Sequence, residues 1–267
     1  MSYNTKKIIS NILLFLETVF LFSIILLFIT KLTFNKKTII KKMNKTDYYE
    51  TVSNSIYDNM KYITKKSGFS KTILDDIYVI EDVKRDINNY VEDIFTNQPV
   101  NIDVSTLKEN VETNLDKYIE EKELEATSEE KTDYVNKIVY TYKNEIRLMK
   151  EYNDSAKDIK NISRITTVLL ILFIVDLIVL MIINKVIFKK LELYVLCFSS
   201  AIALLVTDLL VKLLSNNLFI YNDALTKVFK LVIDKGLIIN LIITVILIVL
   251  GIISKKLIIE EKEEIYE

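Results

Sequence analysis

Long apolar runs alternate with charged segments along this chain. Four runs are almost free of charge and are each long enough, at about 1.5 Å per residue, to cross a hydrocarbon layer of roughly 30 Å. They cover residues 8–30, 165–187, 192–214 and 236–258. The pattern predicts an all-α integral membrane protein with four transmembrane helices.

The segment between the first two runs has a different pattern. Its apolar residues recur every three or four positions, which is typical of amphipathic helices that each bury one stripe. Four such stripes occur, for example Val52–Ile56–Met60, Val83–Ile87–Val91, Val111–Leu115–Ile119 and Val135–Ile138–Tyr142. We therefore expect a helical bundle inserted between the first and second spans.

These patterns divide the chain into four regions. Residues 1–34 hold the N-terminal tail and the first span, and residues 35–163 form the bundle. Residues 164–258 hold the other three spans, with an interfacial loop at 215–235, and residues 259–267 form an acidic tail. The first apolar run follows Lys6 and Lys7, but it is longer than the roughly 7–15 residues of a secretory signal, so we expect an uncleaved signal anchor.

The bundle helices have recognisable start and stop signals. Gly68 is expected to end the first helix, and Ser70 can cap the second. After Ser128 no helix-breaking residue occurs before the second span, so the last bundle helix is predicted to run unbroken into the membrane. A break is expected at Pro99, after which Asp103 or Ser105 starts the third helix, and Ser128 with the two glutamates after it starts the fourth.

The connection between the last two spans can be interpreted in two ways. Asp223 can cap a short helix whose apolar residues share a face, which is the pattern of a helix lying in the membrane interface. An ordinary solvated connector fits the same residues. The apolar positions are Leu225, Val228, Phe229 and Val232.

The orientation of the protein is predicted differently by two arguments. Lysines before the first span, and Lys189–Lys190 in the tight connection between spans two and three, favour cytoplasmic termini and an extracytoplasmic bundle. The total lysine and arginine count near the membrane opposes this, with 8 on the side of the termini and 13 on the side of the bundle. We take the extracytoplasmic bundle as the working prediction.

Several polar residues interrupt the predicted spans. A central aspartate costs about 2.5–3.5 kcal/mol on insertion, so its presence needs a reason. Estimated depths place Glu17, Asp176 and Thr244 in one rough layer and place Asp208 and Asn240 at equal depth in another, as if they met inside a four-helix bundle. Lys212 is the base nearest to Asp208. Glu17 and Asp176 lack a nearby base and are expected to be protonated or to share a proton. The set is Glu17, Asp176, Asp208, Lys212, Asn240 and Thr244.

Three roles are open to these residues. They can be interhelical hydrogen bonds that fix how the spans pack, each contributing roughly 0.6–2 kcal/mol. Glu17 and Asp176 can instead carry protons or a cation on a transport path, which would need oligomerisation in so small a protein. As a third possibility, the acids face a partner subunit.

The amino-acid composition argues against most classes of enzyme. The chain has no histidine, so the commonest general base is missing, and its 3 glycines are too far apart to form a phosphate-binding loop. Its single cysteine, Cys197, lies within the third span. We therefore expect no catalytic residues, no cofactor and no metal. The Asn-, Lys- and Ile-rich composition, poor in glycine, indicates an AT-rich, bacterial genome.

The bundle segment is mildly acidic, with 21 basic and 25 acidic residues. Such a balance does not favour binding of nucleic acid. In layout alone the chain resembles four-span permease-like subunits of ABC-type machines, and also bacterial receptors with a helical sensor bundle between two spans. It shares a sequence motif with neither. We expect a non-enzymatic scaffold, sensor or accessory subunit whose partners are the lipid bilayer and either itself or another membrane protein, with a small oligomeric proton-linked transporter as the alternative.

Overall fold

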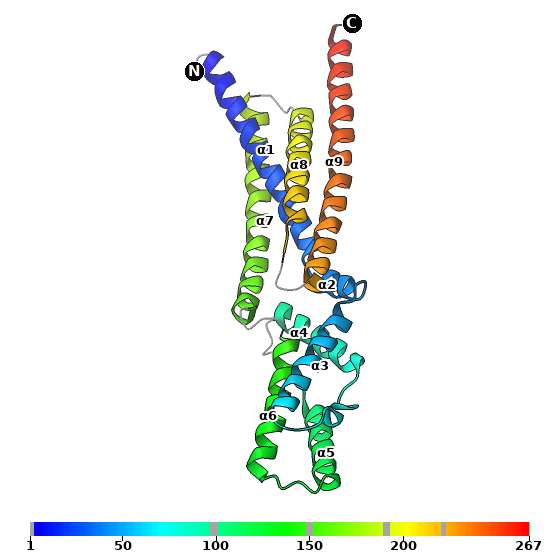
Figure 1. Cartoon of the computed structure of the whole chain (residues 1–267). Helices are drawn as coiled ribbons and strands as arrows, with labels where there is room; N and C mark the ends of the chain where they lie inside the picture. Colours follow the sequence, from blue (N-terminus) through cyan, green and yellow to red (C-terminus); the bar gives the residue numbers. More distant parts are fainter. Residues whose placement is uncertain (1–2, 97–100, 148–151, 189–192, 220–222, 267) are drawn as a thin grey trace. The chain divides into compact units, whose positions relative to one another are not determined.

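The computed structural model consists of two compact units. One comprises Met1–Asn35 and Ser163–Glu267, and the other Lys36–Ile162. The structure describes all residues except 1–2, 97–100, 148–151, 189–192, 220–222 and 267, and it describes no side chains for residue 3, 152–163, 187–188 and 259–266. Every regular element in the described part is a helix, so the predicted all-α class is confirmed (Figure 1).

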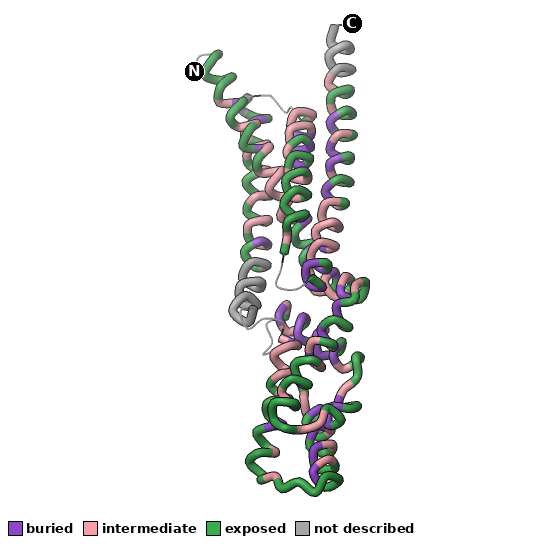
Figure 2. The backbone as a smooth tube through the Cα atoms, viewed as in Figure 1, coloured by how far each residue is buried: buried purple, intermediate pink, exposed green. Residues whose placement is uncertain are grey.

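Four long helices form the membrane unit. All four contain a stretch that is long and apolar enough to span a bilayer, which confirms the predicted number of spans. Their outer surfaces carry many exposed Leu, Ile, Val and Phe side chains, as expected for surfaces that contact lipid (Figure 2). The helices are α1 (Tyr3–Thr33), α7 (Tyr152–Phe188), α8 (Leu193–Asn216) and α9 (Asp223–Tyr266).

Helices α8 and α9 pack closely against each other, and α1 crosses both (Figure 1). The core between them is formed by Cys197, Ala201, Leu204 and Leu247, with apolar residues of α1 and α9 packed around it. Gly251 lets the two helices approach, because a Cβ atom there would lie 3.1 Å from the ring of Phe198. A small residue at a close helix crossing is common in membrane proteins.

The predicted interfacial loop at 215–235 is wrong for most of its length. Asp223 does start a helix, but that helix continues without interruption into the fourth span as α9. The apolar residues Leu225, Val228 and Val232 of this stretch are buried. Because no glycine or proline separates residue 223 from the span, the helix has no local reason to end, and Gly236 is tolerated inside it.

The second unit is a helical bundle. The four predicted amphipathic helices are present, together with a short helix and one 3-10 turn that the sequence did not predict. Their buried stripes form an apolar core that includes Ile56, Met60, Ile87, Val111 and Ile138. The elements are α2 (Lys36–Met43), α3 (Tyr48–Lys66), η1 (Lys71–Leu74), α4 (Ile80–Thr96), α5 (Ser105–Glu121) and α6 (Ser128–Ile146).

Helix ends agree with the sequence signals in part. Gly68 ends α3 with φ +80°, a left-handed conformation in which its N–H and that of Phe69 bond back to Lys65 and Thr64. Ser70 caps the 3-10 turn η1 and not α4, whose first residue lies ten positions on. Thr127 rather than Ser128 caps α6, because its hydroxyl and Glu130 form a reciprocal capping box.

The predicted continuous helix from the bundle into the membrane crosses residues 148–151, which lie outside the described residues. Helix α6 itself ends at Ile146, and the N–H of Arg147 bonds to the carbonyl groups of Lys143 and Glu145. The predicted break at Pro99 also falls outside the described part of the chain. At the start of α5, Asp103 accepts hydrogen bonds from both the N–H and the hydroxyl of Ser105.

Candidate functional site

Among the described residues, buried polar side chains of the spans form two separate hydrogen-bonded clusters. One joins α1 to α7, and the other joins α8 to α9. Each cluster links a pair of helices, which is the geometry that a packing role requires.

The first cluster is centred on Glu17. Its side chain is 1% exposed, and its Oε1 accepts a hydrogen bond of 3.2 Å from Nδ2 of Asn184 in α7. The amide oxygen of Asn184 in turn accepts a hydrogen bond of 3.3 Å from the hydroxyl of Ser10. Ser10 and Glu17 are seven residues apart, so they lie on one face of α1, two turns from each other.

The second cluster is centred on Asn240, which is 3% exposed. Its Nδ2 donates to Asp208 Oδ1 at 2.6 Å and to the carbonyl oxygen of Leu204 at 3.3 Å. Asp208 and Asn240 were predicted to lie at equal depth, and the structure confirms that they meet. Thr244, one turn further along α9, is buried with a hydroxyl that has no hydrogen-bond partner among the described residues.

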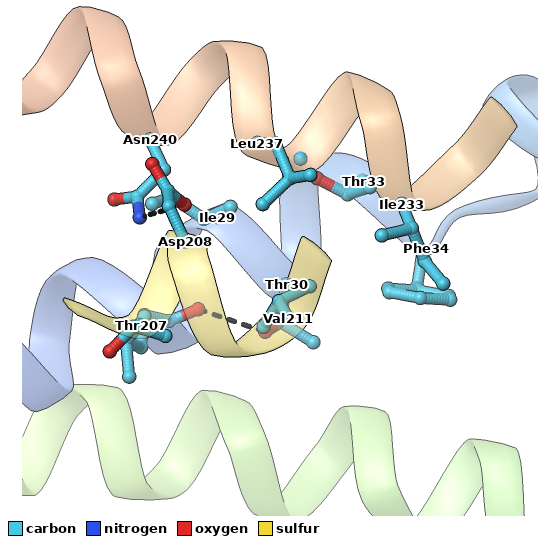
Figure 3. A pocket seen from close by; sticks show the side chains of 12 residues that line it. Ile29, Thr30, Thr33, Phe34, Thr207, Asp208, Val211, Ile233, Leu237 and Asn240 are labelled. Carbon is cyan, nitrogen blue, oxygen red and sulfur yellow. Dashed lines mark hydrogen bonds between the residues drawn. The ribbon is translucent and has the colours of Figure 1, made fainter. Parts of the chain in front are cut away.

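A cavity of about 150 Å³ opens beside Asp208, between α1, α8 and α9. Figure 3 shows Asp208 and Asn240 at one end of it and Phe34 and Ile233 at the other. Most of its wall is apolar. Within the described part of the chain, two buried oxygen atoms of lining residues lack a partner, Thr33 Oγ1 and Asn240 Oδ1.

The prediction that Asp176 turns toward the other acids is wrong for the single chain. Its side chain is exposed on α7, and no described residue bonds to it. Phe173 packs edge-on against Phe20 of α1, with ring centroids 5.3 Å apart, and Asn184 also faces α1. These contacts fix the rotation of α7, and three residues of helix turn Asp176 about 60° away from Phe173. Asp176 also lies about 12 Å along α7 from Asn184, so it cannot share a proton with Glu17.

Lys212 does not pair with Asp208 as the sequence suggested. Its Nζ lies 2.9 Å from Oδ1 of Asp234 on α9, and both side chains are about half exposed. Asp234 was not among the predicted site residues. Asn240 satisfies Asp208 from the neighbouring helix, while the long lysine side chain extends to the more solvated carboxylate.

Asn184 was also missed, although the sequence contained a signal for it. It is a polar residue near the end of the second apolar run, and eleven residues separate it from Phe173, which places both on one face of α7. Uncharged amides receive little weight in hydropathy arguments, yet here one amide is hydrogen-bonded to both Ser10 and Glu17 of α1. No protein-family model, no curated protein and no solved structure matches this chain.

Proposed function

We propose that this protein is a non-enzymatic subunit of a membrane assembly, in which α7 contacts a transmembrane helix of another chain. The observation that carries the proposal is the outward position of Asp176. A carboxyl group on a lipid-facing surface costs about 2.5–3.5 kcal/mol near the bilayer centre. A neighbouring helix that offers a hydrogen bond removes much of this cost.

The surroundings of Asp176 fit this role. The described polar and aromatic contacts of α7 with the rest of the unit all come from α1, through Lys31–Thr167, Phe20–Phe173 and Asn184. The neighbours Leu172, Val175 and Val179 are exposed and apolar. Asp176 is therefore a single polar group in an apolar helix face, which is the arrangement that gives a helix contact its rotation and register.

The bundle supplies the second part of the proposed role. Its mixed surface charge and helical core suit docking or sensing on one side of the membrane, as a scaffold, a sensor or an accessory subunit. We propose that α1 is an uncleaved signal anchor, that the termini are cytoplasmic and that the bundle is extracytoplasmic. Lys6 and Lys7, which precede the apolar stretch of α1, support this orientation.

The assembly can be tested at position 176. Asp176→Leu removes the hydrogen-bonding group and makes α7 easier to insert, whereas Asp176→Asn keeps a hydrogen-bonding side chain. We expect native mass spectrometry of the protein extracted in mild detergent to show a complex that is retained by D176N and lost in D176L. Val175→Leu, an apolar change at the neighbouring exposed position, is the matched control. A complex unaffected by D176L, or a wild-type protein that is monomeric in its own membrane, would refute the proposal.

A second candidate function is proton-linked transport, and the cavity beside Asp208 is the observation that favours it. A carboxylate next to a space large enough for water is a plausible entry point for a proton. Vesicles containing the wild-type protein would then show proton flux, and Asp208→Asn, which preserves hydrogen bonding, would abolish it. Glu17→Gln tests the buried acid in the same assay. Flux that is absent from the wild type, or equal in the variants, excludes this alternative.

A further inference from the structure

We propose that α2 and the turn after it form a docking site for anionic lipid headgroups. The site consists of Lys37, Lys41 and Lys45, which we call the basic stripe. Lys37 and Lys41 lie one turn apart on α2, and Lys45 follows in the next turn. All three are exposed, and their ammonium groups make no ion pair or hydrogen bond with a described residue.

Packing of α2 against the bundle holds the stripe in place. Thr38 and Met43 are buried, and α2 packs against α4. Lys36 forms an ion pair with Glu92 of α4. Because α2 is folded and held against α4, little backbone order has to be gained when a headgroup binds the stripe.

The length of the chain keeps the stripe near the membrane. Helix α1 ends at Thr33 and α2 begins at Lys36, so only Phe34 and Asn35 separate them. Four residues span at most about 14 Å, which limits how far Lys37 can lie from the end of α1. This limit depends on connectivity alone and holds for either orientation of the protein.

The distribution of charge favours lipid over other polyanions. Residues 35–45 contain five lysines and no acidic residue, whereas the remaining bundle residues, 46–163, contain 16 basic and 25 acidic residues. A nucleic acid long enough to bind the stripe would be repelled by the rest of the bundle. The chain is tethered to the membrane by α1, which ends at residue 33, so the stripe can reach the membrane surface without the acidic part of the bundle. Juxtamembrane lysine clusters are attracted to anionic headgroups.

The proposal can be tested on the full-length protein in nanodiscs. We would measure the rate at which an amine-reactive reagent modifies each lysine, by mass spectrometry, in discs of phosphatidylcholine alone and in discs that also contain phosphatidylglycerol. We expect phosphatidylglycerol to slow modification of Lys37, Lys41 and Lys45 by about threefold or more, and high salt to reverse the effect. The exposed lysines Lys61 and Lys65 of α3 serve as internal controls and should not change.

A variant provides an independent measurement. The triple substitution Lys37→Gln, Lys41→Gln, Lys45→Gln should reduce the number of phosphatidylglycerol molecules that remain bound in native mass spectrometry. The same change at three exposed lysines of α3, Lys61, Lys65 and Lys66, is the matched control. Equal lipid retention in both variants would overturn the proposal. Modification rates that do not change when phosphatidylglycerol is present would also overturn it. So would stronger protection of the three lysines by an RNA oligonucleotide in phosphatidylcholine discs.

Discussion

Asp86 is a carboxylate in the core of the bundle, and its neighbours explain why it is tolerated. It is 4% exposed, and its two oxygens accept hydrogen bonds from Tyr142 Oη at 2.8 Å and from Arg85 Nε at 3.0 Å. Buried polar groups are stable when such partners are present. Burial, together with the charge of Asp86, raises the pKa of Tyr142.

Removing the tyrosine hydroxyl tests this arrangement. Tyr142→Phe leaves one carboxylate oxygen of Asp86 buried without its donor, so we expect the bundle to lose about 1–3 kcal/mol of stability. Denaturant unfolding of the full-length protein in detergent, followed by circular dichroism, measures the change. Tyr62→Phe, at an exposed tyrosine of α3, is the control and should have little effect. Equal midpoints for the two variants would show that the buried pair contributes nothing.

The raised pKa values of buried tyrosines predict how the stability of the bundle depends on pH. Burial raises the pKa of Tyr49 and of Tyr134 to about 12, above the value of about 10 expected in the unfolded chain. The folded state therefore binds the phenolic protons more tightly, and the stability it gains is fully present below about pH 10 and is lost as the pH rises toward 12.

This alkaline loss can be measured by repeating the unfolding experiment between neutral pH and about pH 12 while tyrosinate formation is followed by ultraviolet absorbance. We expect unfolding and ionisation of the buried tyrosines to occur together. Tyr134→Phe should show a smaller loss over the same interval, at the expense of the hydrogen bond with Thr64. Tyrosines that all ionise near pH 10 without unfolding would contradict the structure.

At the scale of single residues, the sequence identified the polar residues of the spans better than it identified their hydrogen-bonding partners. That Glu17 is buried, and that Asp208 and Asn240 meet, follow from their depths along helices. The hydrogen-bonding partner of Glu17 and the outward position of Asp176 do not follow from depth, because both depend on the rotation of α7. That rotation is fixed by contacts such as Phe20–Phe173, which link positions far apart in the sequence.

Among the helices, the tight pair α8 and α9 determines the shape of the membrane unit. Their contact runs from the Lys212–Asp234 ion pair, through Asp208 and Asn240, to Gly251 beside Phe198. Hydrophobicity located both spans from the sequence. It did not locate the start of α9, because the first turns after Asp223 carry lysines that hydropathy assigns to a connector.

The two glycines of α9 provide a matched pair of substitutions. Gly251→Ala brings a Cβ atom to 3.1 Å from the Phe198 ring and 3.3 Å from Cys197 Cβ, so these side chains have to give way slightly. Gly236→Ala meets only Thr33, at an ordinary contact distance of 3.4 Å, and gains the helix propensity of alanine, about 1 kcal/mol. We expect G236A to be at least as thermostable in detergent as the wild type and G251A to be less stable than G236A. Equal stability of the two variants would place the close helix contact elsewhere.

For the whole molecule, the account rests on four helices that cross the bilayer and a bundle inserted between the first and second. The segregation of apolar and charged residues along the chain was sufficient to predict this plan. The sequence predicts less strongly on which side of the membrane the bundle lies, since the local lysines and the total count of lysine and arginine disagree.

The most direct test of this plan is labelling of introduced cysteines in sealed vesicles, in a Cys197→Ser background, with a reagent that does not cross membranes. The positions are Asn4, Lys122 and Asn217, with a further cysteine appended at the C-terminus. Four spans predict that Asn4 and the C-terminus are labelled from one side, and that Lys122 and Asn217 are labelled from the other. If Asn4 and the C-terminus are labelled from opposite sides, or if Lys122 and Asn217 are, the number of spans is not four and the account is wrong.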